Sequence, residues 1–140
     1  MKKLIVLRGI PGCGKSTVAE DVANEYVEMG YTADICSADY FFEDENGQYK
    51  FDGSMLNQAH YQSRDDADDA MSAGINLVII DNTNTQKREY QPYIDMANEY
   101  GYDVVIQMVG NLTDIELYAS RNTHGVPKEV IERMAKRFEL

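Results

Sequence analysis

The segment from Gly9 to Ser16 constrains this chain more than any other, because it reads G-x-x-x-x-G-K-S, the pattern of a phosphate-binding loop. The glycines let the backbone turn its N–H groups inward and form a concave anion site. Lys15 adds a positive charge that can reach the β- and γ-phosphates of a nucleotide, and Ser16 offers a hydroxyl to Mg²⁺. The predicted nucleotide-binding residues are Gly12, Cys13, Gly14, Lys15, Ser16 and Thr17.

The residues on both sides of the loop have the pattern that a phosphate-binding loop requires. Residues 3–7 form a short apolar run rich in β-branched side chains, which predicts a strand. Apolar residues then recur at helical spacing after the loop: Val18, Ala19, Val22, Ala23, Tyr26, Val27 and Met29. The alternative, a glycine-rich turn between a strand and a helix, leaves the lysine and the serine unexplained.

Composition narrows the class of protein. The chain has 140 residues, 44% hydrophobic and 26% charged, so we expect one globular domain over residues 1–140. No apolar run approaches the length of a membrane span, and the N-terminal run belongs to the fold rather than to a signal peptide. Cys13 and Cys36 form no metal-ligand pattern, so we expect a reducing compartment, the cytoplasm.

The chain is strongly acidic. It has 24 acidic and 13 basic residues and a net charge of −11. Proteins that coat nucleic acid do so by neutralising phosphates, so this charge argues against such a surface. It does not exclude a single strand end that enters a locally basic pocket.

Alternating apolar runs predict an α/β fold. We expect strands at residues 3–7, 33–36, 75–80 and 103–109, and helices at residues 15–29, 54–73, 89–100, 113–120 and 127–138. Ser54 is the predicted N-cap of the second helix, and residues 113–116 read as a capping box. Strands that alternate with helices indicate a parallel sheet in three layers, flanked by helices. The break at residues 121–127 is typical of a lid.

Three strand ends carry polar or glycine residues that parallel topology brings to one edge: Gly9, Asp39 and Asp81. Asp81 follows the most apolar strand, the position from which a carboxylate holds Mg²⁺ together with the hydroxyl of Ser16. Its alternative reading is a carboxylate of a strand-end turn. Asp39 is the candidate base for an acceptor hydroxyl, and its alternative reading is a helix or turn cap.

Other polar residues have weaker assignments. Arg121 can bring positive charge to the phosphates from the side opposite Lys15, and its alternative is a surface arginine. His124 either joins Arg121 or packs, whereas His60 is expected to be a structural histidine. Residues 82–84 either cap the next helix or touch the acceptor. The aspartates at positions 65–69 spread over the polar face of a helix, which favours a solvated face over a metal site.

Four segments together resemble the small P-loop kinases related to the kinase domain of bacteriophage polynucleotide kinase. They cover residues 7–17, 37–41, 79–84 and 121–127, in the expected order. A cellular branch of that group carries the D-N-T-N and R-N-x-H-G-V-P segments, and zeta-toxin-type kinases are more distant relatives. The resemblance implies a P-loop kinase fold with a C-terminal helical lid, and ATP and Mg²⁺ bound by Lys15 and Ser16. It also implies that Asp39 activates a 5′-hydroxyl and that Arg121 is the lid arginine.

One region departs from that resemblance. The phage enzyme has a second acidic residue and then an arginine for the acceptor's phosphate, whereas this chain has Tyr40, Phe41 and Phe42 there. Phe41, Phe42 and Tyr49 are instead candidates for stacking on a base.

The sequence therefore predicts an ATP- and Mg²⁺-dependent kinase with Asp39, Lys15 and Arg121 as catalytic residues, and with the 5′-hydroxyl of a polynucleotide as the favoured acceptor. The first alternative is a kinase of a small molecule such as a nucleoside or sugar nucleotide, which the net charge favours. The second is a nucleotide-binding switch without turnover.

Overall fold

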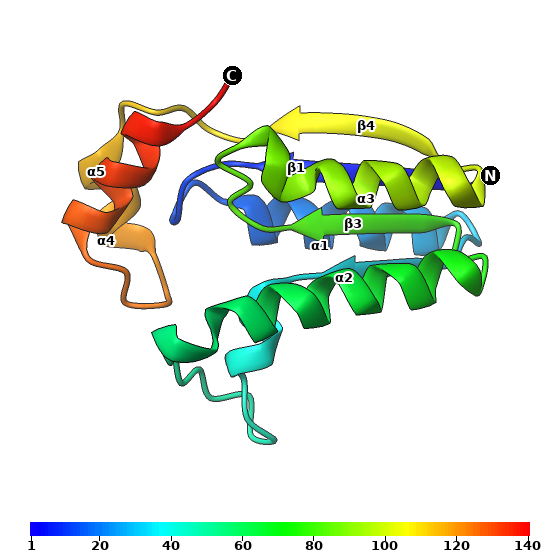
Figure 1. Cartoon of the computed structure of the whole chain (residues 1–140), viewed down its shortest axis with the longest axis horizontal. Helices are drawn as coiled ribbons and strands as arrows, with labels where there is room; N and C mark the ends of the chain where they lie inside the picture. The colour runs from blue at the N-terminus through cyan, green and yellow to red at the C-terminus, as the bar shows by residue number, and fades with distance from the viewer.

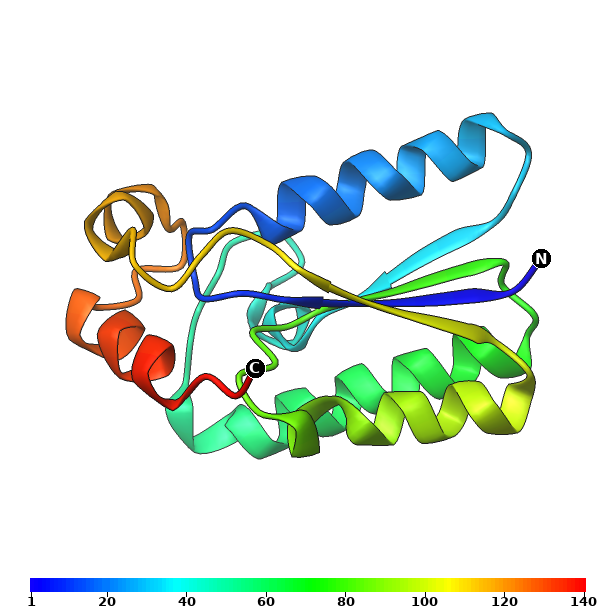
Figure 2. The same ribbon diagram turned by 90° about the horizontal axis from the view of Figure 1, so that it is seen from above.

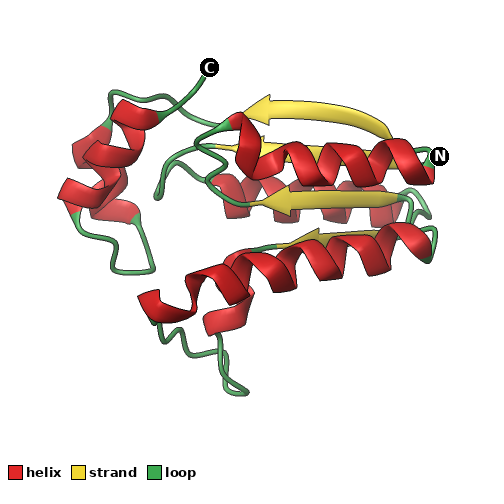
Figure 3. Cartoon of the chain, viewed as in Figure 1, coloured by secondary structure: helices red, strands yellow, loops and turns green.

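The computed structural model describes residues 1–140 and contains one sheet of four parallel strands (Figures 1 and 3). The strands are β1 (Lys3–Arg8), β2 (Ala33–Cys36), β3 (Leu77–Asp81) and β4 (Asp103–Met108), in the order β2-β3-β1-β4. Leu7 of β1 lies opposite Asp81 of β3, and Cys36 of β2 lies opposite Ile80. The segments that follow these three strands therefore start side by side at one edge of the sheet.

Helices cover both faces of the sheet. Helix α1 (Lys15–Glu28) lies on one face, and helices α2 (Leu56–Ser72) and α3 (Lys87–Tyr100) lie on the other (Figure 2). Two short helices, α4 (Ile115–Arg121) and α5 (Lys128–Arg137), form a separate pair beyond the carboxyl ends of the strands, at the left of Figure 1. The predicted three-layer α/β fold with a C-terminal helical lid is confirmed. None of the helices has the length and apolarity that crossing a membrane requires.

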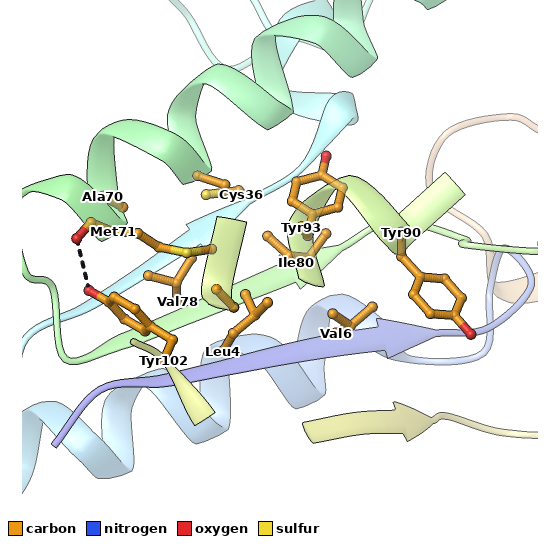
Figure 4. Packing of buried hydrophobic residues seen from close by; sticks show 12 residues of the cluster. Leu4, Val6, Cys36, Ala70, Met71, Val78, Ile80, Tyr90, Tyr93 and Tyr102 are labelled. Carbon is orange, nitrogen blue, oxygen red and sulfur yellow. Dashed lines mark hydrogen bonds between the residues drawn. The ribbon is translucent and has the colours of Figure 1, made fainter. Parts of the chain in front are cut away.

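The core has two halves because successive residues of a strand point to opposite faces of the sheet. On the α2/α3 side, Leu4 and Val6 of β1 and Val78 and Ile80 of β3 pack against Tyr93 (Figure 4). The alternate residues Ile5, Leu7, Leu77 and Ile79 pack on the other side with α1 and α5. All five residues of β3 are buried, as expected for a central parallel strand.

Strand β4 forms an exposed edge of the sheet. It pairs only with β1, and Val105, Ile106 and Met108 are each more than a third exposed. The apolar run that predicted this strand therefore reflects β propensity more than burial on both faces.

Both predicted helix caps are wrong. The side chain of Asp52, not of Ser54, caps a short 3₁₀ helix, η2 (Gly53–Met55), and α2 begins after it without a side-chain cap. The capping box at residues 113–116 does not form, because Asn111 Oδ1 accepts the N–H groups of Thr113 and Asp114. A side chain that bonds its own downstream backbone competes with a cap in this way.

Helix ends also differ from the predicted apolar stripes. Val27 and Met29 at the end of α1 are exposed, whereas Ala19 and Ala23 are buried. In α5 the fully buried residue is Ile131.

Arg8 is a buried cation at the end of β1, with 6% of its surface exposed. Its guanidinium donates to the carbonyl oxygens of Asn84 (2.9 Å), Thr85 (3.3 Å) and Glu139. It lies between the rings of Tyr90 and Phe138, 4.8 and 4.6 Å from their centroids. These contacts attach the chain after α5 to the loop after β3.

We expect Arg8→Met to lower the free energy of unfolding by about 2–4 kcal/mol, because it removes the charged donor that three backbone carbonyl oxygens share at a buried site. Chemical denaturation of this variant beside Arg88→Met, a change at an exposed arginine, measures the effect. Equal stabilities of the two variants would contradict the structural role of Arg8.

Candidate functional site

The loop after β1 and the start of α1 form an anion site. Gly12 and Gly14 have φ angles of 84° and 98°, which side chains with a Cβ rarely adopt. Helix α1 starts at Lys15 with no side-chain cap and no acidic residue in its first turn. Its first N–H groups have no carbonyl partner within the helix, so they are available to phosphate oxygens.

Ser16 and Asp81 meet at this site, as predicted. Ser16 Oγ donates to Asp81 Oδ2 at 2.9 Å, which joins the start of α1 to the end of β3. Asp81 is 6% exposed, and burial raises the pKa of its carboxyl, whereas Lys15 and the Ser16 hydroxyl oppose that rise. A hydroxyl and a carboxylate beside a phosphate site are the oxygen donors that Mg²⁺ uses together with water and phosphate. The residues present therefore fit a magnesium ion.

Asp39 lies at the start of a short 3₁₀ helix, η1 (Ala38–Phe42), directly after β2. Its N–H donates to Ser37 Oγ at 3.2 Å, so Ser37 is the cap and Asp39 is free of that role. Its side chain remains 45% exposed, accepts a hydrogen bond from Tyr49 through Oδ1, and has Oδ2 3.3 Å from His124 Nδ1. Asp39 and Asp81 follow the neighbouring parallel strands β2 and β3, so both carboxylates lie at the same edge of the sheet.

Arg121, at the end of α4, reaches the phosphate loop itself. Its Nε and Nη2 donate to the carbonyl oxygen of Gly12 at 3.2 and 2.9 Å, and its guanidinium lies over the ring of Tyr118. Gly12 has no room for a Cβ, which would collide with the carbonyl of Tyr118. The lid therefore packs directly on the loop, and Arg121 stands beside the anion site.

The two asparagines after β3 have a role that the sequence analysis missed. Asn82 Oδ1 accepts the N–H of Ala38 at 2.8 Å, and Asn84 Nδ2 donates to the carbonyl of Leu7 at 2.8 Å. Neither residue caps α3, whose start is instead fixed by hydrogen bonds between Thr85 and Glu89. The asparagines join the ends of β1, β2 and β3. In the sequence, the only indication of this role was the polar run that follows an apolar strand.

The predicted aromatic residues divide into two groups. Phe42 is 6% exposed and packs with Ala38 and Ala59, so it is core and not a stacking surface. Phe41 is 38% exposed, and Phe51, which was not among the predicted residues, is 57% exposed. Tyr49 is half-buried beside Asp39.

The two histidines also differ. His60 is half-buried on α2, and burial lowers the pKa of its imidazole. His124 lies in the loop between α4 and α5, and its Nδ1 is 3.3 Å from Asp39 Oδ2. Arg121 instead bonds the carbonyl of Gly12, so the two lid residues contact different parts of the site.

The aspartates on α2 form no metal site. No group of three or more His, Cys, Asp or Glu side chains is arranged to hold a metal ion.

The sequence matches the family described as an AAA domain over residues 4–140. The chain belongs to this AAA domain family. NEDD4-binding protein 2 of Homo sapiens is 36% identical over 138 residues, which cover 97% of this chain and 8% of that protein. The chain thus spans a small part of this relative's length.

Solved structures resemble the fold of this AAA domain. A chain of the Pnkp1/Rnl/Hen1 RNA repair complex has a TM-score of 0.70 and 20% identity, covering 98% of this chain and 44% of that chain. Kti12 of Chaetomium thermophilum, solved with ADP-AlF3, has a TM-score of 0.68 and 17% identity, covering 98% of this chain and 80% of that chain. The predicted P-loop kinase fold is confirmed, and the AAA domain is a P-loop NTP-binding, kinase-like domain.

The raised pKa of Asp81 has a consequence for stability. The folded AAA domain keeps a proton that the unfolded chain releases between the ordinary carboxyl pKa and the raised one. The free energy of unfolding therefore falls as pH rises through that window and stays lower at pH 7. We expect Asp81→Asn to raise the melting temperature without Mg²⁺ at pH 7 by roughly 4 °C, about 1 kcal/mol.

The same variant should lose the further rise in melting temperature that Mg²⁺ gives the nucleotide-bound protein. Differential scanning calorimetry beside Asp21→Asn, a change at an exposed aspartate of α1, measures both effects. A lower melting temperature of the metal-free Asp81→Asn protein would contradict this account.

Proposed function

We propose that this AAA domain is an ATP- and Mg²⁺-dependent kinase that transfers the γ-phosphoryl group to a hydroxyl, with the 5′-hydroxyl of a polynucleotide as acceptor. The observation that carries the proposal is the grouping of Asp39 with the Ser16–Asp81 pair at the strand ends. A domain that only binds nucleotide has no need of a half-exposed carboxylate beside its phosphate site.

Each residue has a defined part in the proposed reaction. Lys15 and the amides at the start of α1 bind the phosphates, and Arg121 adds positive charge from the lid. Ser16 and Asp81 hold Mg²⁺, which neutralises charge on the phosphate oxygens when it is bound. The acceptor oxygen forms a bond to the γ-phosphorus, the bond from that phosphorus to the β,γ-bridging oxygen breaks, and ADP leaves. Asp39 takes the proton of the hydroxyl.

A polynucleotide acceptor is supported by two observations. A chain in an RNA repair complex shares the fold, and the exposed rings of Phe41 and Phe51 lie on the same segment as Asp39. Aromatic faces bind bases without sequence preference. The net charge of −11 argues against a broad nucleic-acid surface, so a polynucleotide would be contacted only at its end. The same charge favours the second candidate function, a kinase of a small acceptor such as a nucleoside.

Transfer of radiolabelled phosphate from [γ-³²P]ATP to a 5′-hydroxyl oligonucleotide, with nucleosides in parallel, tests the proposal. Labelling of the oligonucleotide supports it. If only the nucleosides are labelled, the protein is a small-molecule kinase and not a polynucleotide kinase. ATP binding with no acceptor labelled would leave only a nucleotide-binding switch.

Asp39→Asn should keep ATP affinity within about twofold and reduce transfer at least ~100-fold, because the amide cannot accept the hydroxyl proton. Isothermal titration with ATP and initial rates of transfer measure the two effects. Asp65→Asn, at an exposed position of α2, is the control. Transfer at the wild-type rate by the Asp39 variant would show that Asp39 is not the base.

Lys15→Ala should weaken ATP binding by roughly 10- to 100-fold, the loss expected for a charge-assisted contact to phosphate. Titration with the nucleotide measures it, and Lys87→Ala, at an exposed lysine of α3, should bind as the wild type does. Unchanged affinity in the Lys15 variant argues against the phosphate-binding assignment of residues 9–16.

A further inference from the structure

Two ring side chains from different parts of the chain hold the two oxygens of Asp39. Tyr49 Oη donates to Asp39 Oδ1 at 3.2 Å, and His124 Nδ1 lies 3.3 Å from Asp39 Oδ2. The two rings stack on each other, with centroids 4.1 Å apart and planes 22° apart. The carboxylate thus contacts Tyr49 from the segment after η1 and His124 from the lid.

The loop that carries His124 has a fixed shape. Asn122 Oδ1 accepts the N–H of Val126 at 2.8 Å, and its Nδ2 donates to the carbonyls of Val126 and Ala119 at 3.2 and 3.1 Å. Directly before this loop, Arg121 is bonded to the phosphate loop at Gly12. His124 therefore reaches Asp39 when the lid lies over the phosphate site.

Tyr49 is also supported by its surroundings. Its backbone pairs with Glu43 in an antiparallel bridge, and its ring contacts those of Phe42 and Phe51. Burial and the neighbouring Asp39 raise the pKa of Tyr49, so its hydroxyl stays protonated and remains a donor.

We infer that His124 and Tyr49 are positioning residues for the acceptor base, and that the lid orients Asp39 through His124. This inference rests on the proposed function of Asp39. A half-exposed carboxylate is otherwise free to rotate about its last side-chain bond, and a misplaced base loses much of its rate advantage. Each carboxylate oxygen accepts more than one hydrogen bond, so the acceptor hydroxyl can bind while both rings stay in place.

Two substitutions at His124 separate the contact between Nδ1 and the carboxylate from the stacking. His124→Phe keeps a ring on Tyr49 but removes the donor, and His124→Asn removes the ring but keeps a donor nitrogen near the position of Nδ1. We expect the Phe variant to lower kcat for transfer about 10- to 100-fold with the KM for ATP unchanged, and the Asn variant to recover most of that loss.

Tyr49→Phe tests the other oxygen. It should lower kcat about tenfold with the KM for ATP unchanged, since only the donor to Oδ1 is lost. Tyr61→Phe is the matched control, because Tyr61 is 65% exposed on α2. It should have the wild-type kcat.

Three results would overturn the inference. They are a wild-type kcat in His124→Phe, equal losses in the Phe and Asn variants, and a kcat above wild type in His124→Phe. The last result would mean that His124 obstructs the acceptor rather than orienting the base.

A measurement without turnover separates this inference from the proposed function. The chain has two histidines, so long-range ¹⁵N–¹H spectra can assign both imidazoles. At pH about 8.5, where free imidazole is neutral, His124 should carry its proton on Nδ1 in the wild type and shift towards Nε2–H in Asp39→Ala. His60 should not change. If the tautomer of His124 does not change in Asp39→Ala, the contact is overturned even if the protein is a kinase. If the tautomer shifts but the protein transfers no phosphate, only the proposed kinase activity is overturned.

Discussion

Hydrogen bonds from two buried asparagine side chains fix the relative positions of the loops that follow β1, β2 and β3. Asn82 holds the backbone of Ala38, directly before Asp39, and Asn84 holds the carbonyl of Leu7, two residues before Gly9. Gly9 in turn donates its N–H to the carbonyl of Thr83 at 3.1 Å. Parallel pairing brings the three loops to one edge, and these amides determine how far apart the functional groups on them lie.

The lid completes the site from the opposite side. It contributes Arg121 to the phosphate loop and His124 to Asp39, and it approaches Gly12 so closely that only glycine fits there. The phosphate loop and Asp39 are therefore both in contact with the segment that contains these two short helices. Displacement of the helical pair would therefore change the surroundings of the phosphate loop and of Asp39 together.

Local patterns in the sequence were sufficient for the strands, the main helices and the phosphate loop. The P-loop spacing and the apolar run before Asp81 were enough to predict that Ser16 and Asp81 lie near each other, whereas their role in holding Mg²⁺ remains a prediction. The partners of Arg8, Asn84 and Tyr49 were not predictable, since each bonds a residue that tertiary packing brings near. The failed caps at Ser54 and Thr113 have the opposite cause, because Asp52 and Asn111 compete locally for the same backbone groups. The roles of Asp39 and Arg121 in transfer remain predictions.

The helical pair α4–α5 is fastened to the rest of the molecule near both of its ends. At its start, the N–H of Asn111 bonds Tyr118 Oη, and after α5 the N–H of Glu139 bonds the carbonyl of Thr85 at 2.7 Å. Between these two points, Tyr118 and Ile131 are buried in the core and Arg121 bonds Gly12, so the pair is attached along its whole length. Because His124 lies in the loop that joins the two helices, a displacement of the pair from the phosphate loop would also move this histidine away from Asp39.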